Sequence, residues 1–238
     1  MNVAKTIQLI TLLVAVPCLT YAQSTQTNVQ LLVDNAIASY QKTELSHWSF
    51  QVERYENEEG DVTSSIEEFI PQHDTSGGWA LLEQNGKTPT QKQKKAFKQK
   101  KKNKKEDSLN IKLSDLIDRD SLTLASDSPS HLKASFNVWI EKLGEDAKGK
   151  LQGSLIYNKK NQYIEQITIT NTATFSPVFS AKISDLKIVF TFTYDKGFVL
   201  PKKQTLDMKG SFAFFTEIDE TSTDTFTYKG YHPALTSG

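Results

Sequence analysis

The feature that most constrains the fold is an alternation of apolar and polar side chains that begins at Trp48 and recurs through most of the chain. In the segment "ISDLKIVFTFTY", for example, apolar side chains stand at every second position from Leu186 to Tyr194. A period of two places alternate side chains on opposite faces of a β-strand. Turn residues separate the segments, which favours about nine or ten strands joined as antiparallel hairpins. The expected strands lie at residues 48–53, 61–70, 78–84, 132–142, 150–158, 163–171, 183–194, 206–215 and 223–231.

One amphipathic helix is expected ahead of the strands, at residues 28–44, with Thr27 and Gln30 as a capping box at its start. A twisted antiparallel sheet of about ten strands curls or closes. We therefore expect the helix to fill the concave side of the sheet. The predicted fold class is mainly β (α+β): a strongly curved antiparallel sheet, or half-open barrel, with an N-terminal amphipathic helix on its concave face and a second short helix. The apolar stripe of the helix comprises Val29, Leu32, Val33, Ala36, Ile37 and Tyr40.

The N-terminus is typical of a secretory signal peptide: a basic start, an apolar stretch over residues 6–20 and small residues before a break. We expect cleavage near Ala22, which removes residues 1–22 and leaves residues 23–238 as one periplasmic domain. One alternative to a cleaved signal peptide is a membrane anchor, although a spanning helix needs roughly 20 apolar residues. A second alternative is lipid modification of Cys18.

The number of cysteines is consistent with export to the periplasm. Cys18 is the only cysteine, so the expected mature chain has no disulfide and must be held by its own core. The roughly 216 residues after the cleavage site suffice for one domain with a sizeable core. No Asn-X-Ser/Thr acceptor occurs in the sequence, which favours a bacterial envelope over a eukaryotic secretory route.

The order of these features resembles the bacterial outer-membrane lipoprotein carriers, the LolA/LolB-like half-barrels. The resemblance rests on a signal peptide, an amphipathic helix and "HWSFQVERYENEEGDVTSSIEEFIP" as a first hairpin ending in Pro71. The segments "GWALLEQNGKTPT" and "FSPVFSAKISDLKIVFTFTYDKGFVLPKKQTLDMKGSFAFF" are similar to uncharacterised exported proteins of the same superfamily. The resemblance implies a periplasmic protein whose concave apolar face shelters acyl chains. The carriers have an arginine before that proline, and Ile70 stands there in this chain, which argues against lipoprotein transfer itself.

A lysine-rich segment, "QKQKKAFKQKKKNKK", covers residues 91–105 with nine lysines, in a chain of 28 basic and 28 acidic side chains. We expect a helical or disordered insertion at about residues 88–107, with Thr88 and Gln91 as its capping pair. Repulsion between lysines three and four positions apart predicts fraying of the helix beyond Phe97.

Two roles are open for this segment. Blocks of like charge are usually solvated linkers. Near an anionic surface, however, each basic residue contributes up to about 1 kcal/mol, so anionic headgroups, lipopolysaccharide or an acidic envelope protein are candidate partners. Nucleic acid is not an expected partner, because export separates the two and Phe97 alone is available for stacking. The expected contacts are Lys94, Lys95, Lys98, Lys100, Lys101, Lys102, Lys104 and Lys105.

Aromatic residues on the inward face of the expected strands either fill the core or line a pocket for an apolar ligand. Both readings are open, because a barrel of this girth either packs with side chains or holds a ligand. The expected ligand-binding residues are Trp48, Phe50, Trp79, Phe190, Phe192, Phe212 and Phe214.

Motifs for catalysis and for cofactors are missing from the sequence. Ser-x-x-Lys occurs three times, at Ser39, Ser130 and Ser184, without the companion motifs of penicillin-binding enzymes. The histidines show no i, i+4 pair and have no cysteine to complete a zinc site. Adjacent acidic residues such as Glu67 and Glu68 should point to opposite faces of a strand. We therefore expect no enzyme, no metal and no cofactor.

Three hypotheses for function remain. The favoured one is a monomeric, noncatalytic envelope protein that binds an acyl chain, a lipid or a lipoprotein in a concave cavity. The second is a scaffold whose concave side is plugged by the first helix. The third is a hydrolase, which would require a buried and mutually bonded Ser/His/acid cluster. A pocket of several hundred Å³ lined by aromatic side chains would separate the first hypothesis from the second.

Overall fold

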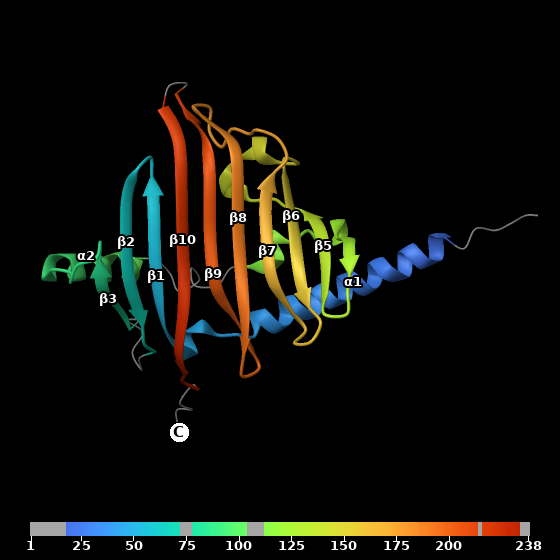
Figure 1. Cartoon of the computed structure of the whole chain (residues 1–238), viewed down its shortest axis with the longest axis horizontal. Coiled ribbons are helices and arrows are strands. Elements are labelled where there is room, and N and C mark those ends of the chain that lie inside the picture. The colour runs from blue at the N-terminus through green and yellow to red at the C-terminus, as the bar shows by residue number, and fades with distance from the viewer. Residues whose placement is uncertain (1–17, 72–77, 104–111, 214–215, 234–238) are drawn as a thin grey trace, which may run out of the picture.

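The computed structural model describes residues 18–71, 78–103, 112–213 and 216–233, and one antiparallel sheet of ten strands dominates it (Figure 1). The spatial order is β3-β2-β1-β10-β9-β8-β7-β6-β5-β4, so the sheet is open, with β3 and β4 at its edges. The predicted mainly-β fold class is confirmed. The strands are β1 (Trp48–Glu58), β2 (Asp61–Phe69), β3 (Trp79–Gln84), β4 (Thr123–Asp127), β5 (His131–Asn137), β6 (Leu151–Asn158), β7 (Tyr163–Asn171), β8 (Ala181–Asp195), β9 (Phe198–Phe212) and β10 (Thr216–Tyr231).

Tight turns join the hairpins that the sequence predicts. Glu59 and Gly60 connect β1 to β2 with φ of 54° and 92°, and Lys196 and Gly197 connect β8 to β9 with φ of 49° and 91°. Two-residue turns with positive φ at both positions match the right-handed twist of the strands, and glycine adopts that conformation without steric cost.

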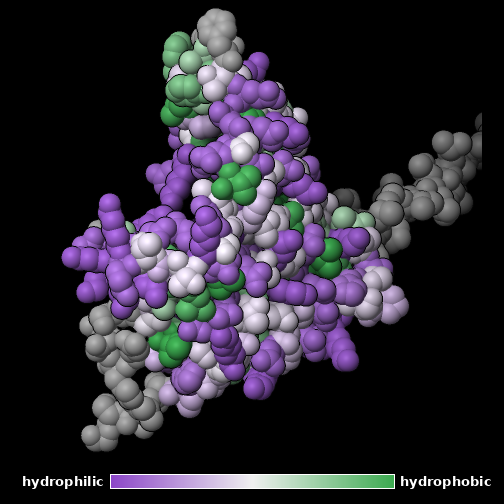
Figure 2. Space-filling view, turned by 60° about the vertical axis from the view of Figure 1, so that its left-hand side comes forward, coloured by the Kyte–Doolittle hydropathy of each residue, from purple (hydrophilic) through white to green (hydrophobic). Residues whose placement is uncertain are grey.

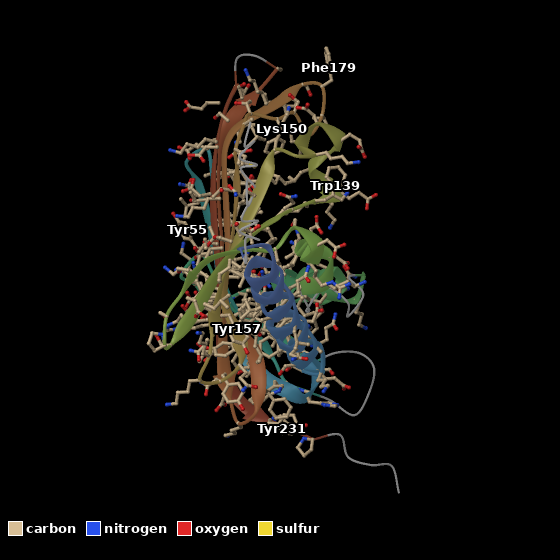
Figure 3. The ribbon with its side chains drawn as sticks, turned by 90° about the vertical axis from the view of Figure 1, so that its right-hand side faces the viewer. Tyr55, Trp139, Lys150, Tyr157, Phe179 and Tyr231 are labelled. Carbon is tan, nitrogen blue, oxygen red and sulfur yellow. The ribbon has the colours of Figure 1, made fainter. Side chains whose placement is uncertain are left out.

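Helix α1 lies across the concave face, where it contacts β4, β7 and β9 (Figures 1 and 3). Its stripe Val29, Val33, Ala36, Ile37 and Tyr40 is buried, as helical spacing predicts. The expectation that this helix fills the concave side is confirmed for the half of the sheet that it covers. The α-helices are α1 (Cys18–Gln41), α2 (Gln91–Asn103) and α3 (Leu113–Leu116), and short 3-10 helices lie at Leu45–His47, Arg119–Ser121, Glu141–Leu143 and Glu145–Ala147.

The predicted bounds of the first helix are wrong at both ends. The helix begins at Cys18 rather than at residue 28 and ends at Gln41 rather than at residue 44, so Thr27 lies inside it and not at its start. Gln30 consequently has another role: its side-chain amide donates a hydrogen bond to the carbonyl oxygen of Arg119, at 3.0 Å. The helix spans the predicted cleavage site, and residues 1–17 lie outside the described part of the chain.

Several strands differ from the sequence prediction. β4 is not predicted at all, β9 begins at Phe198 rather than near residue 206, β10 begins at Thr216 rather than at residue 223, and β1 extends to Glu58 rather than ending at residue 53. β5 ends at Asn137, while Val138 and Ile140 continue into a 3-10 turn and still reach the core. The apolar alternation therefore outlasts the hydrogen-bonded strand there, because inward side chains are buried in the turn as well.

Buried apolar side chains form two clusters. The first cluster lies between α1 and the strands from β4 to β9, and it includes Phe190 and Phe192. The second cluster lies on the other part of the sheet. Its buried members are Leu45, Trp48, Phe50, Val52, Phe69 and Leu200, with Trp79, Phe198, Phe226 and Tyr228 packed against them.

Candidate functional site on the concave face

Four aromatic side chains of the second cluster form one row across four strands. Trp79 pairs with Phe69, Phe69 with Phe50, and Phe50 with Tyr228. The ring centroids of successive members lie 5.3, 5.3 and 5.7 Å apart. Residues paired across strands point to the same face, so inward positions of β3, β2, β1 and β10 together build a continuous aromatic wall. We call Trp79, Phe69, Phe50 and Tyr228 the aromatic row.

Trp48 lies beside this row, with its ring centroid 5.6 Å from that of Tyr228. Its Nε1 atom is buried and has no hydrogen-bond partner among the described residues. A buried donor without an acceptor costs roughly 1–3 kcal/mol. By contrast, the Tyr228 hydroxyl donates to the carbonyl oxygen of Pro201 at 2.8 Å, and burial raises the pKa of Tyr228, so its phenol stays neutral.

An ionic network borders the aromatic row. Glu67 lies two positions before Phe69 on the inward face of β2, and its carboxylate accepts from Arg54 Nε at 3.1 Å and from Lys101 Nζ at 2.6 Å. Arg54 Nη1 also pairs with Asp224 on β10. The Glu67 side chain is only 9% exposed, so both cations are needed to offset the cost of burying its charge.

The network shifts two pKa values. Burial by itself lowers the pKa of Arg54, but the Glu67 and Asp224 carboxylates outweigh it, and the pKa is raised overall. Burial raises the pKa of Asp224, and the nearby Arg54 charge offsets only part of that rise. The guanidinium therefore remains charged at any working pH and holds together two carboxylates on β2 and β10, the strands on either side of β1.

Helix α2 contacts β3 and is held near the aromatic row by Lys101. The Lys101 ammonium sits 3.8 Å from the ring centroid of Trp79 and 5.2 Å from that of Phe97, so a cation–π contact adds to its ion pair with Glu67. One lysine of the run thus serves as an anchor for the helix.

The predictions about the start and end of this helix are wrong. Thr90 rather than Thr88 caps it: Gln93 N donates to Thr90 Oγ1 at 3.3 Å, and Thr90 N donates to Gln93 Oε1 at 2.8 Å. The helix does not fray beyond Phe97 but continues to Asn103. The physical reason is the Lys101 anchor, which offsets the repulsion between neighbouring lysines.

The other lysines of the run are placed differently from Lys101. Lys94 is half-buried, and Lys104 and Lys105 lie outside the described residues. The exposed lysines of α2 are Lys92, which is not among the predicted contacts, and Lys95, Lys98, Lys100 and Lys102, which are.

The predicted ligand-binding residues fall into three places. Trp48, Phe50 and Trp79 belong to the second cluster. Phe190 and Phe192 belong to the first cluster, where Phe192 packs edge-on against Tyr40 of α1 with centroids 5.2 Å apart. Phe212 lies at the far end of β9 and is largely exposed, and Phe214 lies outside the described residues.

Sequence reasoning did not identify the ionic network. Arg54 continues the inward positions of Trp48, Phe50 and Val52 at a period of two, which is the signal that could have placed it on the concave face. Glu67 and Glu68 do point to opposite faces, as expected: Glu68 accepts from Lys229 at 2.8 Å instead of joining the network.

A polar groove of about 430 Å³ lies elsewhere, over β4 to β7, and its lining includes His131 and Glu165. His131 Nε2 lies 3.0 Å from Glu165 Oε2, and His131 Nδ1 lies 2.9 Å from Ser130 Oγ. Asn158 Nδ2 donates to the same Glu165 oxygen at 3.1 Å. These contacts link serine, histidine and carboxylate, but more than a third of the His131 and Glu165 side chains is exposed. This is not the buried cluster that the hydrolase hypothesis requires.

Comparisons with protein-family models, with curated proteins and with solved structures each returned no match. Function must therefore be argued from the geometry of the chain. Within the described ranges, no helix is long and apolar enough to cross a membrane, and no group of three or more His, Cys, Asp or Glu side chains is placed to hold a metal ion.

Proposed function

We propose that this chain is an exported envelope protein of the LolA/LolB type that binds an acyl chain, as a lipid or a lipidated protein, at the aromatic row. The observation that carries the proposal is the combination of a continuous aromatic wall with one buried, unpartnered donor, Trp48 Nε1. Aromatic and aliphatic walls with few polar groups are typical of sites for apolar ligands. An ester or carboxyl oxygen at the end of an acyl chain is the acceptor that this indole lacks.

The helix next to the aromatic row, α2, is held in a way that allows the site to open. α1 packs on the first cluster, whereas α2 approaches the row through Lys101 and contacts β3 at the edge of the sheet. The apolar side chains of α2 are Ala96 and Phe97, and neither is fully buried, so displacing α2 exposes less apolar surface than displacing α1 with its buried stripe would. In this proposal, displacement of α2 admits the acyl chain, and Phe190 and Phe192 serve as core under α1.

The test is native mass spectrometry of the protein purified from its host, followed by organic extraction and lipid analysis. We expect a stoichiometric acyl-chain ligand on the wild-type chain. Trp48→Phe keeps an aromatic ring but removes the donor, so it should retain less ligand. Trp139→Phe removes the same donor from a half-buried tryptophan outside the second cluster and should retain as much ligand as the wild type.

A ligand-free wild-type mass, with no uptake of a fluorescent fatty acid, would refute lipid binding. The scaffold would then be the better proposal, and one observation already favours it: the apolar stripe of α1 is buried in the first cluster and plugs that half of the concave face.

We further propose that four exposed lysines of α2, Lys95, Lys98, Lys100 and Lys102, contact anionic headgroups. They share one short helix, which concentrates positive charge in a chain whose formal charges sum to zero. At up to about 1 kcal/mol each, four lysines contribute at most roughly a thousandfold in affinity. Such a contact weakens with salt, because the Debye length is only about 8–10 Å at physiological ionic strength.

Exchanging these four lysines for glutamine should therefore weaken binding to vesicles of anionic phospholipid by roughly a hundredfold at low salt, with little difference left at high salt. Co-sedimentation measures this directly. Equal losses in the variant and in its control would mean that α2 has no special role. The matched control replaces four exposed lysines outside α2: Lys187, Lys196, Lys202 and Lys203.

A further inference from the structure

One end of the sheet presents apolar side chains to solvent. Phe179, in the connection from β7 to β8, is 99% exposed, Val178 beside it is 57% exposed, and Phe212 at the end of β9 is 47% exposed. Figure 2 shows hydrophobic residues gathered at the top of the molecule, and Figure 3 shows Phe179 projecting from the same end. We call Val178, Phe179 and Phe212 the apolar tip.

The surroundings of the apolar tip are close to neutral. Residues 172–181 and 210–213 contain no charged side chain. The last row of paired residues across β8, β9 and β10 is Ala181, Phe212 and Thr216, and the next row is Lys182, Ser211 and Glu217. One cation on β8 and one anion on β10 thus lie on either side of β9 next to the tip, which does not select for a strongly charged partner.

Hydrogen bonds hold the two segments of the tip in place. Ala213 N donates to the carbonyl oxygen of Ser180 at 2.7 Å, which ties the end of β9 to the start of β8. Ser176 N donates to Asp146 Oδ2 at 2.7 Å, which fixes the loop from its other side. Phe179 is therefore presented by an anchored loop, and these backbone donors are already paired before any partner approaches.

We propose that the apolar tip inserts into the headgroup region of a phospholipid bilayer. A stable protein interface needs roughly 800 Å² on each partner, while an aromatic side chain buries roughly 150–250 Å², so two phenylalanines and a valine fall short of a dimer contact. A bilayer sets no such minimum, because single aromatic and aliphatic side chains partition into its interface. The nearly neutral flank suits zwitterionic headgroups. This surface involves neither the aromatic row nor the lysines of α2, so the inference goes beyond the proposed function.

The experiment places an environment-sensitive nitrobenzoxadiazole label on a single cysteine of the full chain, with Cys18→Ser as background. One protein carries Phe179→Cys. The control carries Tyr55→Cys, at an exposed aromatic on the opposite face of the sheet from α1 (Figure 3). With phosphatidylcholine vesicles, we expect the emission of the label at position 179 to shift to shorter wavelength and that at position 55 to stay unchanged. The site-specific signal separates the tip from any contribution of the N-terminal apolar stretch.

Salt and a second variant complete the test. The shift should persist at high salt, and Val178→Ser with Phe212→Ser, added to the labelled chain, should lower the vesicle affinity by roughly tenfold. Both residues are about half exposed, so the variant should lose little stability relative to the parent. The proposal fails if the label at position 179 does not respond, or if its response disappears with salt. It also fails if the shift occurs without vesicles and grows with protein concentration, since a second copy would then cover the tip.

Discussion

Replacing Arg54 with methionine should lower the free energy of unfolding by about 2–4 kcal/mol, the cost of leaving buried carboxylates without their cation. Arg54 contacts both Glu67 and Asp224, and its removal leaves Glu67 with Lys101 as its remaining ion-pair partner. Because the Arg54 side chain is itself 31% exposed, we expect the loss at the lower part of the range for fully buried networks. Urea denaturation of the two proteins at neutral pH measures the difference.

The pH dependence of this variant gives a sharper test than the loss alone. The Arg54 charge holds down a pKa of Asp224 that burial has raised. Without Arg54 that pKa rises further, so the folded variant binds a proton more readily than its unfolded chain. The stability lost at neutral pH should therefore be partly regained as pH falls through the raised pKa. A deficit that stays constant in mild acid would show that packing, rather than charge, explains the loss.

Arg119→Met is the matched control for Arg54. Arg119 Nη1 lies 3.1 Å from Asp34 Oδ1, at a distance like that of the Arg54–Glu67 contact, but both side chains are largely exposed. Exposed ion pairs contribute at most about 1 kcal/mol. The same substitution at the two arginines therefore separates the effect of burial from the effect of deleting a guanidinium.

The sheet was predictable because burial of one face imposes a period of two. The segment at residues 183–194 shows this alternation and lies within β8, and residues 163–171 coincide with β7. β4 escaped prediction for the opposite reason. It is a short edge strand in which Leu124 is half-buried and its other residues are exposed, so its hydrogen bonds to β5 leave no mark in the hydrophobic pattern.

Helix ends were less predictable because capping residues permit a boundary without requiring one. Thr27 fits a cap, but α1 continues past it to Cys18. The end of α2 depends on a contact between elements far apart in sequence, Lys101 with Glu67. Local charge repulsion was the only information the sequence offered there, and it predicted an earlier end.

The sequence predicts which aromatic residues face the concave side, but it does not predict which of them lie next to one another. The alternation of apolar and polar residues predicts that Trp48, Phe190 and Phe212 point to the same face of the sheet. It does not predict in which half of the ten-stranded sheet each residue lies. That depends on the pairing of β1 with β10, which aligns Phe50 with Tyr228 across 178 residues of sequence. The partners of Arg54 follow from the same pairing, so no local pattern names them.

Phe50→Ala should lower the free energy of unfolding by about 3–5 kcal/mol, as expected for removal of a fully buried phenylalanine. Phe50 is 0% exposed and contacts Phe69, Trp79, Phe226 and Tyr228 at ring-centroid distances of 5.3–6.0 Å. Tyr55→Ala is the control on the same strand: its side chain lies on the opposite face, 43% exposed, and should cost less than about 0.5 kcal/mol. Thermal and urea unfolding measure both.

The same variant distinguishes the two noncatalytic proposals for the concave face. If the aromatic row binds acyl chains, Phe50→Ala removes part of the wall and weakens fatty-acid uptake. If the second cluster is a filled core, the wild type takes up no fatty acid, and the variant instead gains a dry cavity that admits a small apolar molecule such as benzene. Phe50→Leu should cost less than about 1.5 kcal/mol, so it reports the same change in binding should the alanine variant fail to fold. A gain of benzene binding without any acyl-chain binding in the wild type would contradict the carrier and favour the scaffold.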